Sequence, residues 1–261
     1  MKQELIRPII RVGNSAGVIL PREWLNGKAK IELVEKPLDI KKDVLEILDS
    51  YLEDIIGIYL VGSYARGEQT DRSDVDVLVI TNKVNKTIEN DKYYLILISE
   101  ERVRKALEKN ILPLLPMLKE AKTLINDKLI EKYRETLLTK KNLREHIELT
   151  KSALNVNKAM INLDKETETN CSDSVAYSLV LRLRETYLVE CLMKNKMWSN
   201  RELLKMIKDI SSSLKSYEGY LRVKDDKKME ENLPIEEAER LLNYLYKKIE
   251  EHEKWAKRRK S

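Results

Sequence analysis

Two aspartates, Asp74 and Asp76, are the residues whose type and spacing most directly suggest chemistry in this chain. They open an apolar run that predicts a β-strand. Because side chains alternate along a strand, both carboxylates lie on one face, while Val75, Val77 and Val79 face a core on the other. A divalent cation offsets the repulsion between two such carboxylates, and Mg²⁺ is typically held by one or two carboxylates together with substrate phosphates. The pair therefore predicts a site for Mg²⁺ or Mn²⁺.

A glycine and a serine end the apolar run that precedes the aspartates. Gly62 lets the backbone turn sharply and lets a ligand approach closely. Ser63 places a hydroxyl and an N–H at the start of the following helix, which favours anions. Arg66 and Arg72 add positive charge for phosphate oxygens. The stretch 58–80 thus predicts a strand, a turn with a short helix, and a strand, and its candidate nucleotide-binding residues are Gly62, Ser63, Arg66 and Ser73.

This combination resembles a known signature. Gly62-Ser63, followed by Asp74-Val75-Asp76 and apolar residues, is similar to the motif of the DNA polymerase β-like nucleotidyltransferases, especially their minimal members. Arg66 lies within the Gly-Ser-x-Ala-Arg-Gly form that these members often show. The resemblance implies that the Gly-Ser turn binds a nucleoside triphosphate, with ATP expected, and that Asp74 and Asp76 are catalytic and hold Mg²⁺. It implies transfer of a nucleoside monophosphate to a hydroxyl of a protein, an RNA or a small molecule.

One part of that family's pattern, a third carboxylate on the next strand, is missing. The next predicted strand, 93–98, is apolar or aromatic throughout, and acids lie only at its ends. In the family this acid commonly serves as a metal ligand or as a base toward the attacking hydroxyl. The resemblance to antibiotic nucleotidyltransferases allows an acid from the helical region to substitute, and the candidates are Glu145, Glu148, Glu185 and Glu190. Nucleotide binding is therefore better supported than catalysis.

Residues 1–38 form a unit too small for a core of its own. A strand, a Gly-Asn turn, a second strand, a helical turn opened by Pro21 and a returning strand from Ala29 to Val34 are predicted. The pattern resembles the swapped-hairpin domain of the AbrB and MazE type, in which two hairpins interleave into a dimer that often binds DNA. Its candidate DNA-binding residues are Arg7, Arg11, Arg22 and Lys28. The alternative is that the hairpin only dimerises the protein or packs on its own catalytic domain.

The rest of the chain predicts two further domains and an α+β fold. Residues 37–39 suggest a linker, and domain 39–130 is expected to form a mixed sheet with helices behind it. It begins with an amphipathic helix, 40–52, and includes a helix capped by Ser99 and a short final strand, 121–125. Domain 131–261 shows helical spacing alone and predicts four long helices in an antiparallel bundle.

The predicted bundle is similar in placement and size to HEPN domains or to the bundle of aminoglycoside nucleotidyltransferases. HEPN ribonucleases carry an arginine a few residues before a histidine on one helix. Neither His146 nor His252 has an arginine with that layout, so we expect no ribonuclease activity. Arg184 and Tyr187 belong to a polar stripe on one predicted helix, which either faces the cleft and reads the base or acceptor or is ordinary helix surface.

Composition sets broader limits. The net charge of +5 over 261 residues does not by itself indicate a nucleic-acid binder. Two cysteines, Cys171 and Cys191, suggest buried packing residues in or beside one helix of a cytoplasmic protein, without a disulfide. With only two histidines and no Cys/His cluster, a zinc site is not expected. There is no signal peptide or long apolar run, so no membrane contact is predicted.

Two functions follow from these observations. The first is a Mg²⁺-dependent nucleotidyltransferase, acting as a homodimer on a triphosphate and an unidentified acceptor. The second is a DNA-binding regulator, antitoxin-like or encoded by a mobile element, whose nucleotidyltransferase domain binds nucleotide without efficient catalysis. The missing third carboxylate favours the second, and the intact Gly62-Ser63 and Asp74/Asp76 favour the first.

Overall fold

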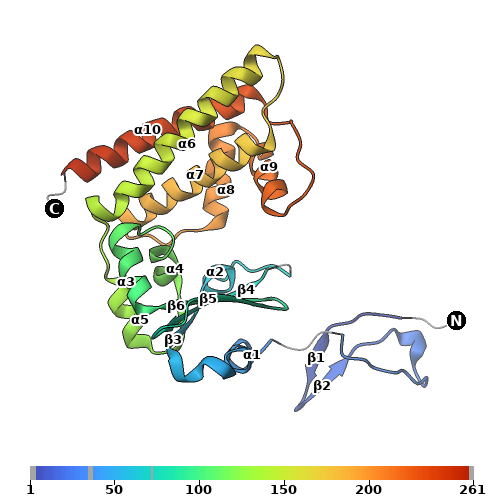
Figure 1. The fold of residues 1–261 in the computed structure, drawn as a ribbon. Helices are drawn as coiled ribbons and strands as arrows, with labels where there is room; N and C mark the ends of the chain where they lie inside the picture. The colour runs from blue at the N-terminus through green and yellow to red at the C-terminus, as the bar shows by residue number, and fades with distance from the viewer. Residues whose placement is uncertain (1–3, 35–37, 72, 259–261) are drawn as a thin grey trace. The chain divides into compact units, whose positions relative to one another are not determined.

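The computed structural model describes residues 4–34, 38–71 and 73–258. Contacts divide the chain into two compact units, Met1–Asp39 and Ile40–Ser261. Pro37 of the expected linker lies outside the described residues. The two units are drawn in Figure 1 and are described separately below.

The first unit is a single hairpin with a helical turn. Strands β1 (Ile9–Val12) and β2 (Ser15–Val18) pair antiparallel, and Gly13 takes a positive φ of 60° in the tight turn between them. One helical turn, Arg22–Trp24, follows Pro21 as expected. The prediction of a strand at Ala29–Val34 is wrong, because these residues are irregular. Among the described residues of one chain, β1 and β2 pair only with each other. No described residue before Val44 is buried.

The second unit contains a five-stranded mixed sheet, which confirms the α+β class. Its strands lie in the order β5 (Lys86–Asn90), β6 (Tyr93–Ser99), β4 (Val75–Thr81), β3 (Ile55–Leu60) and β7 (Lys122–Ile125). Only β4 and β6 pair in parallel, and the other neighbours are antiparallel. Strand β7 confirms the short strand expected near 121–125. Strand β5 was not expected, because its polar residues lie on an exposed edge where no apolar alternation is required.

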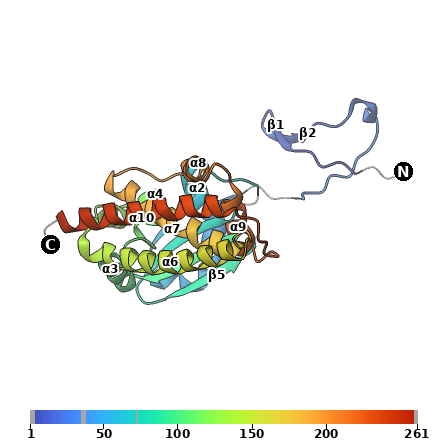
Figure 2. The same ribbon diagram turned by 90° about the horizontal axis from the view of Figure 1, so that it is seen from above.

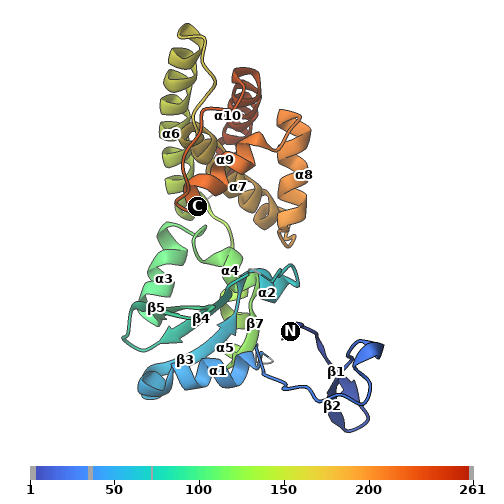
Figure 3. The ribbon, with the colours of Figure 1, turned by 90° about the vertical axis from the view of Figure 1, so that its right-hand side faces the viewer.

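Both faces of the sheet are covered. The valines Val75, Val77 and Val79 are fully buried as predicted, and Leu78 and Ile80 on the opposite face are buried equally well. Helix α1 (Ile40–Ile47) lies on one side, and α3 (Glu100–Lys109) and α4 (Leu115–Glu120) lie on the other (Figure 3). Ser99 caps α3 by accepting a bond from the N–H of Arg102, as predicted. The first helix is shorter than expected and continues as a 3₁₀ helix, Asp49–Asp54, since Asp and Ser disfavour helix interiors.

Further along the chain the structure is helical. Helix α5 (Asp127–Arg134) follows β7, and the remaining helices are α6 (Lys140–Glu166), α7 (Asp173–Met193), α8 (Asn200–Ser211), α9 (Lys215–Lys224) and α10 (Ile235–Arg258). The described region from 140 onward therefore has five helices instead of four. Helix α9 was missed because it is short and has few aliphatic residues to mark a period.

The two longest helices of this region, α6 and α10, run side by side (Figure 2). Cys171 and Cys191 are buried and free, as predicted. Among the described residues, no helix is both long and apolar enough to cross a membrane.

Candidate functional site

The candidate site is built where β3 ends and β4 begins. Strand β3 leads through Val61 into a five-residue helix, α2 (Gly62–Arg66), and the N–H of Val61 donates to the carbonyl of Asp76 at 2.9 Å. Gly62 has a φ of +70°, a conformation that only glycine adopts without strain. A Cβ added at Gly62 would lie 2.1 Å from Oδ2 of Asp76. The glycine is therefore required both by backbone conformation and by the closeness of the carboxylate.

Asp74 and Asp76 act on each other electrostatically, as their spacing predicts. Asp76 is partly buried and Asp74 is exposed. Burial raises the pKa of the Asp76 carboxyl, and the negative charges of Asp74 and Glu120 raise it further, while Arg66 lowers it. A carboxylate in this environment is stabilised by a cation, and carboxylate oxygens suit Mg²⁺. Within the described ranges, no three acidic, histidine or cysteine side chains form a ready-made metal cluster.

The other residues predicted for nucleotide binding have different surroundings. No described residue hydrogen-bonds to the N–H or hydroxyl of Ser63. Ser73 accepts a bond from the N–H of Thr70 at 2.8 Å, so its hydroxyl closes its own loop. Arg72 lies outside the described residues. The structure thus brings Gly62 to Asp76, and it places the Ser73 hydroxyl against the Thr70 loop.

A third carboxylate, Glu120, was missed by the sequence reasoning. It is the last residue of α4, separated by one residue from the start of β7, and only 6% of it is exposed. Its Oε1 accepts the Gly62 N–H at 2.7 Å, and its Oε2 accepts Nη1 of Arg66 at 2.7 Å and Nε1 of Trp198 at 2.7 Å. The only sequence signal was an acid beside a predicted strand. That β7 lies next to β3, and so beside the Gly-Ser turn, is not visible in the sequence.

Strand β6, on which the family's pattern has a third carboxylate, contains no acidic residue. In the parallel ladder between β4 and β6, Tyr94 lies opposite Asp76. Of the substitutes considered in the helical region, Glu148, Glu185 and Glu190 form ion pairs with Arg144, Arg182 and Lys248 respectively, and Glu145 is exposed.

Arg66 is held on several sides. Its Nε donates to Oε2 of Glu68 at 2.9 Å, its Nη1 donates to Glu120, and its guanidinium carbon lies 3.8 Å from the ring centroid of Trp198. Burial raises the pKa of Glu68, but hydrogen bonds from Ser199 and Arg66 outweigh it and leave that pKa below its usual value. Nη2 of Arg66 has no partner among the described residues.

The four cations expected to contact DNA lie in the first unit. All four are exposed residues: Arg7, Arg11, Arg22 and Lys28. Nε of Arg11 donates to the carbonyl of Gly13 at 3.0 Å, at the hairpin turn.

Comparison with known proteins places the chain in a family. Residues 41–177, more than half of the chain, match the model of the nucleotidyltransferase domain family. One curated relative, from Methanocaldococcus jannaschii, is named as a protein adenylyltransferase and is 39% identical over 62 residues, which cover 24% of this chain and 60% of that protein.

Two solved structures are also similar to the chain. A nucleotidyltransferase-like protein from Exiguobacterium sibiricum is 14% identical over 81% of this chain and 75% of its own, with a TM-score of 0.38. A spectinomycin adenyltransferase from Enterococcus faecialis is 15% identical over 80% of this chain and 97% of its own, with a TM-score of 0.40. On the match to the family model, the chain belongs to the nucleotidyltransferase domain family.

Proposed function

We propose that the protein transfers a nucleoside monophosphate from a nucleoside triphosphate, ATP by preference, to a hydroxyl acceptor. The observation that carries the proposal is the closeness of Gly62 to Asp76, because the turn to which we assign phosphate binding then lies beside the carboxylate pair. The hydroxyl oxygen bonds to the α-phosphorus, the bond from that phosphorus to the bridging oxygen breaks, and pyrophosphate leaves. The hydroxyl proton passes to solvent or to a nearby base.

The residues take separate parts in this reaction. Asp74 and Asp76 would hold Mg²⁺ or Mn²⁺, which when bound neutralises charge on the transferring phosphoryl group. Ser63 and the Nη2 end of Arg66 offer donors to the triphosphate oxygens. Glu120 keeps the Gly62 N–H and the Arg66 guanidinium in place through its two oxygens. The name of the relative suggests a protein hydroxyl as the acceptor.

Labelling with α-labelled nucleoside triphosphates tests this proposal. Wild-type protein is incubated with each triphosphate and Mg²⁺, with and without cell extract, beside a D74A/D76A variant. We expect label on a protein, RNA or small-molecule product only with the wild type. Asp71→Ala is the matched control, because Asp71 is an exposed aspartate of the same loop, and it should label like the wild type. Transfer that survives in D74A/D76A would remove the assigned site.

A second candidate function is DNA binding by the first unit as a dimer. Two observations favour it: the unit has no buried described residue, and four of its cations are exposed. Two copies could cover each other's aliphatic side chains and combine their charges along one DNA backbone. Mobility-shift experiments with the full chain and with residues 40–261 test it. We expect salt-sensitive binding only with the full chain, and equal binding by both would exclude a role for residues 1–39.

A further inference from the structure

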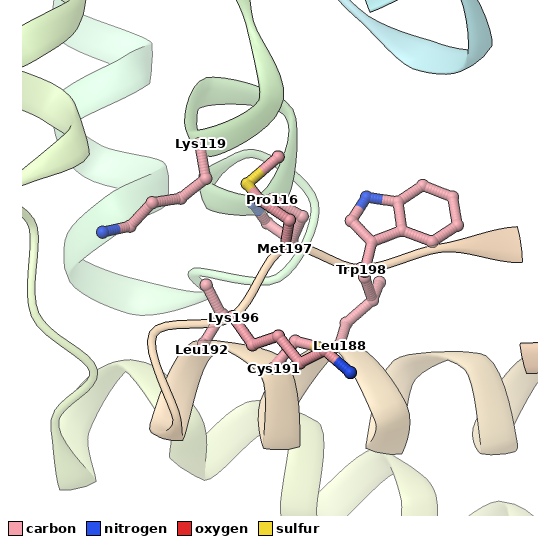
Figure 4. Close-up of a pocket in the computed structure, with 8 residues that line it drawn as sticks. All are labelled: Pro116, Lys119, Leu188, Cys191, Leu192, Lys196, Met197 and Trp198. Atoms are coloured by element: carbon pink, nitrogen blue, oxygen red, sulfur yellow. The ribbon is translucent and has the colours of Figure 1, made fainter. Parts of the chain in front are cut away.

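The connection between α7 and α8 lies against the helix that ends in Glu120. Met197 and Trp198 of this connection line a small hollow together with Pro116 and Lys119 of α4, and Leu188, Cys191 and Leu192 of α7 form its floor (Figure 4). In this view the indole of Trp198 points away from the hollow. The indole contacts Arg66 and Glu120 of the candidate nucleotide site.

Trp198 makes three contacts with charged groups there. Its Nε1 donates to Oε2 of Glu120 at 2.7 Å. The guanidinium carbon of Arg66 lies 3.8 Å from its ring centroid, and that of Arg184 lies 5.3 Å from it. A guanidinium within about 6 Å of an indole face is attracted to it. One side chain thus contacts both residues that hold the phosphate-binding turn, Arg66 by stacking and Glu120 by a hydrogen bond.

The two residues after Trp198 reinforce this arrangement. The hydroxyl of Ser199 donates to Oε1 of Glu68 at 2.6 Å, and the N–H of Asn200 donates to Oε2 at 3.2 Å. Glu68 in turn accepts Nε of Arg66 at 2.9 Å. Ser199 is also the N-cap of α8, so the start of that helix is connected to Arg66 through Glu68.

We propose that Trp198 is a positioning residue of the nucleotide site: it holds Arg66 and Glu120 so that Nη2 of Arg66 meets a phosphate oxygen. The inference rests on the proposed nucleotidyltransferase function and adds that the helical region supplies part of the site. An arginine side chain loses rotamer freedom when it is fixed, and this loss is a cost to binding. Contacts that fix Arg66 before the nucleotide arrives remove that cost from binding.

The test is a double-mutant cycle on nucleotide binding, measured by calorimetry with an unreactive ATP analogue and Mg²⁺. We expect W198L to weaken binding about tenfold, since it loses both the stacking and the hydrogen bond, and W198F to weaken it about threefold, since the stacking remains. In an R66A background, W198L should weaken binding less than twofold, because Trp198 acts through Arg66. In the transfer assay the expected change is in KM for the nucleotide, with kcat within about twofold of wild type.

Met197→Leu is the matched control, since Met197 lines the same hollow and is not among the described residues that bond to or stack on Arg66. It should bind nucleotide like the wild type. A W24F/W255F protein, which keeps Trp198 as its single tryptophan, gives a spectroscopic readout. We expect its emission to change on titration with the analogue and to saturate with the affinity that calorimetry gives.

The outcomes separate the two proposals. Wild-type affinity in W198L, or an equal effect of W198L with and without Arg66, would overturn the role of Trp198. Transfer by the wild type would still support the proposed nucleotidyltransferase function. Unchanged emission at saturating nucleotide would also overturn it. Failure of the wild type itself to bind any nucleotide would overturn both proposals together.

Discussion

At the scale of single residues, Gly62 is the most constrained position of the site. It combines a positive φ with a Cβ position already occupied by the Asp76 carboxylate. Gly67, five residues later, has the same backbone conformation at φ +71°, but a Cβ there meets nothing within 4 Å. Substitutions at these two glycines therefore separate the effect of backbone strain from the effect of crowding the Asp76 carboxylate.

Gly62→Ala should abolish transfer, because the methyl group must displace Asp76 or the turn. Gly67→Ala carries only the conformational cost of about 1–2 kcal/mol, and it should retain transfer. Thermal unfolding of both variants and the labelling assay check this. Transfer by Gly62→Ala at the wild-type rate would show that Asp76 is free to move away from the turn without loss of function.

Glu120 is the second residue with a clear expectation. Its two oxygens accept three hydrogen bonds, two of them on Oε2. Glu120→Gln keeps the volume but puts an amide donor against other donors. We expect a loss of about 2–3 kcal/mol in the free energy of unfolding and weaker nucleotide binding. Glu101→Gln, which affects only an exposed pair with Lys105, should change stability by less than about 0.5 kcal/mol. Equal urea midpoints for the two variants would contradict the assigned role of Glu120.

At the scale of elements, a histidine pair joins α6 to α10. His146 and His252 are both 2% exposed, their ring centroids are 5.7 Å apart, and three of their four ring nitrogens have no hydrogen-bond partner among the described residues. His146 also lies 3.7 Å from Oε2 of Glu185 on α7. Burial, together with the charges of His146 and Lys248, lowers the pKa of His252 to about 3, although Glu251 acts in the opposite direction.

This pair predicts a pH dependence of stability. The unfolded chain takes up a proton on His252 near its ordinary pKa of about 6.5, and the folded chain does so only near 3. Stability is therefore lost as pH falls through this window, by about 2 kcal/mol between pH 7 and pH 5. Urea unfolding of wild type and His252→Leu at both pH values checks this. The variant should lose about 2 kcal/mol less than the wild type, and identical losses would contradict the assignment.

At the scale of the whole molecule, the two units differ in whether they have an apolar core of their own. The second has an extensive apolar core that extends through the sheet, α3 to α5 and the helical region. The described part of the first unit exposes eleven large aliphatic side chains, among them Ile6, Ile19, Leu25, Ile31 and Val34. A hairpin of this size is marginal in water unless another surface covers it.

We therefore expect the full chain to be a dimer and residues 40–261 to be a monomer. The second unit should fold without the first, because its core is internal to it. Light scattering after gel filtration gives the two masses, and circular dichroism confirms that the shorter chain is folded. A dimer formed by residues 40–261 would place the interface in the second unit, and a monomeric full chain would indicate that the hairpin is covered within one copy.

The local sequence determined the centre of this protein. The apolar runs, Gly62 and the Asp74/Asp76 pair predicted the strand–turn–strand unit correctly, and Ser99 marked the start of α3. These features depend on the conformational preferences of neighbouring residues, which can be read from spacing alone. Helix α9 and strand β5 were missed because short or exposed elements need little apolar periodicity.

Only the tertiary structure decided which distant residues complete the site. Glu120 reaches Gly62 across 58 positions of the chain, and Trp198 reaches Glu120 across 78. Both contacts depend on β7 lying beside β3 and on the α7–α8 connection lying against α4. Such packing follows from burial of the whole core, which is a property of the folded chain and leaves no mark on the spacing of neighbouring residues.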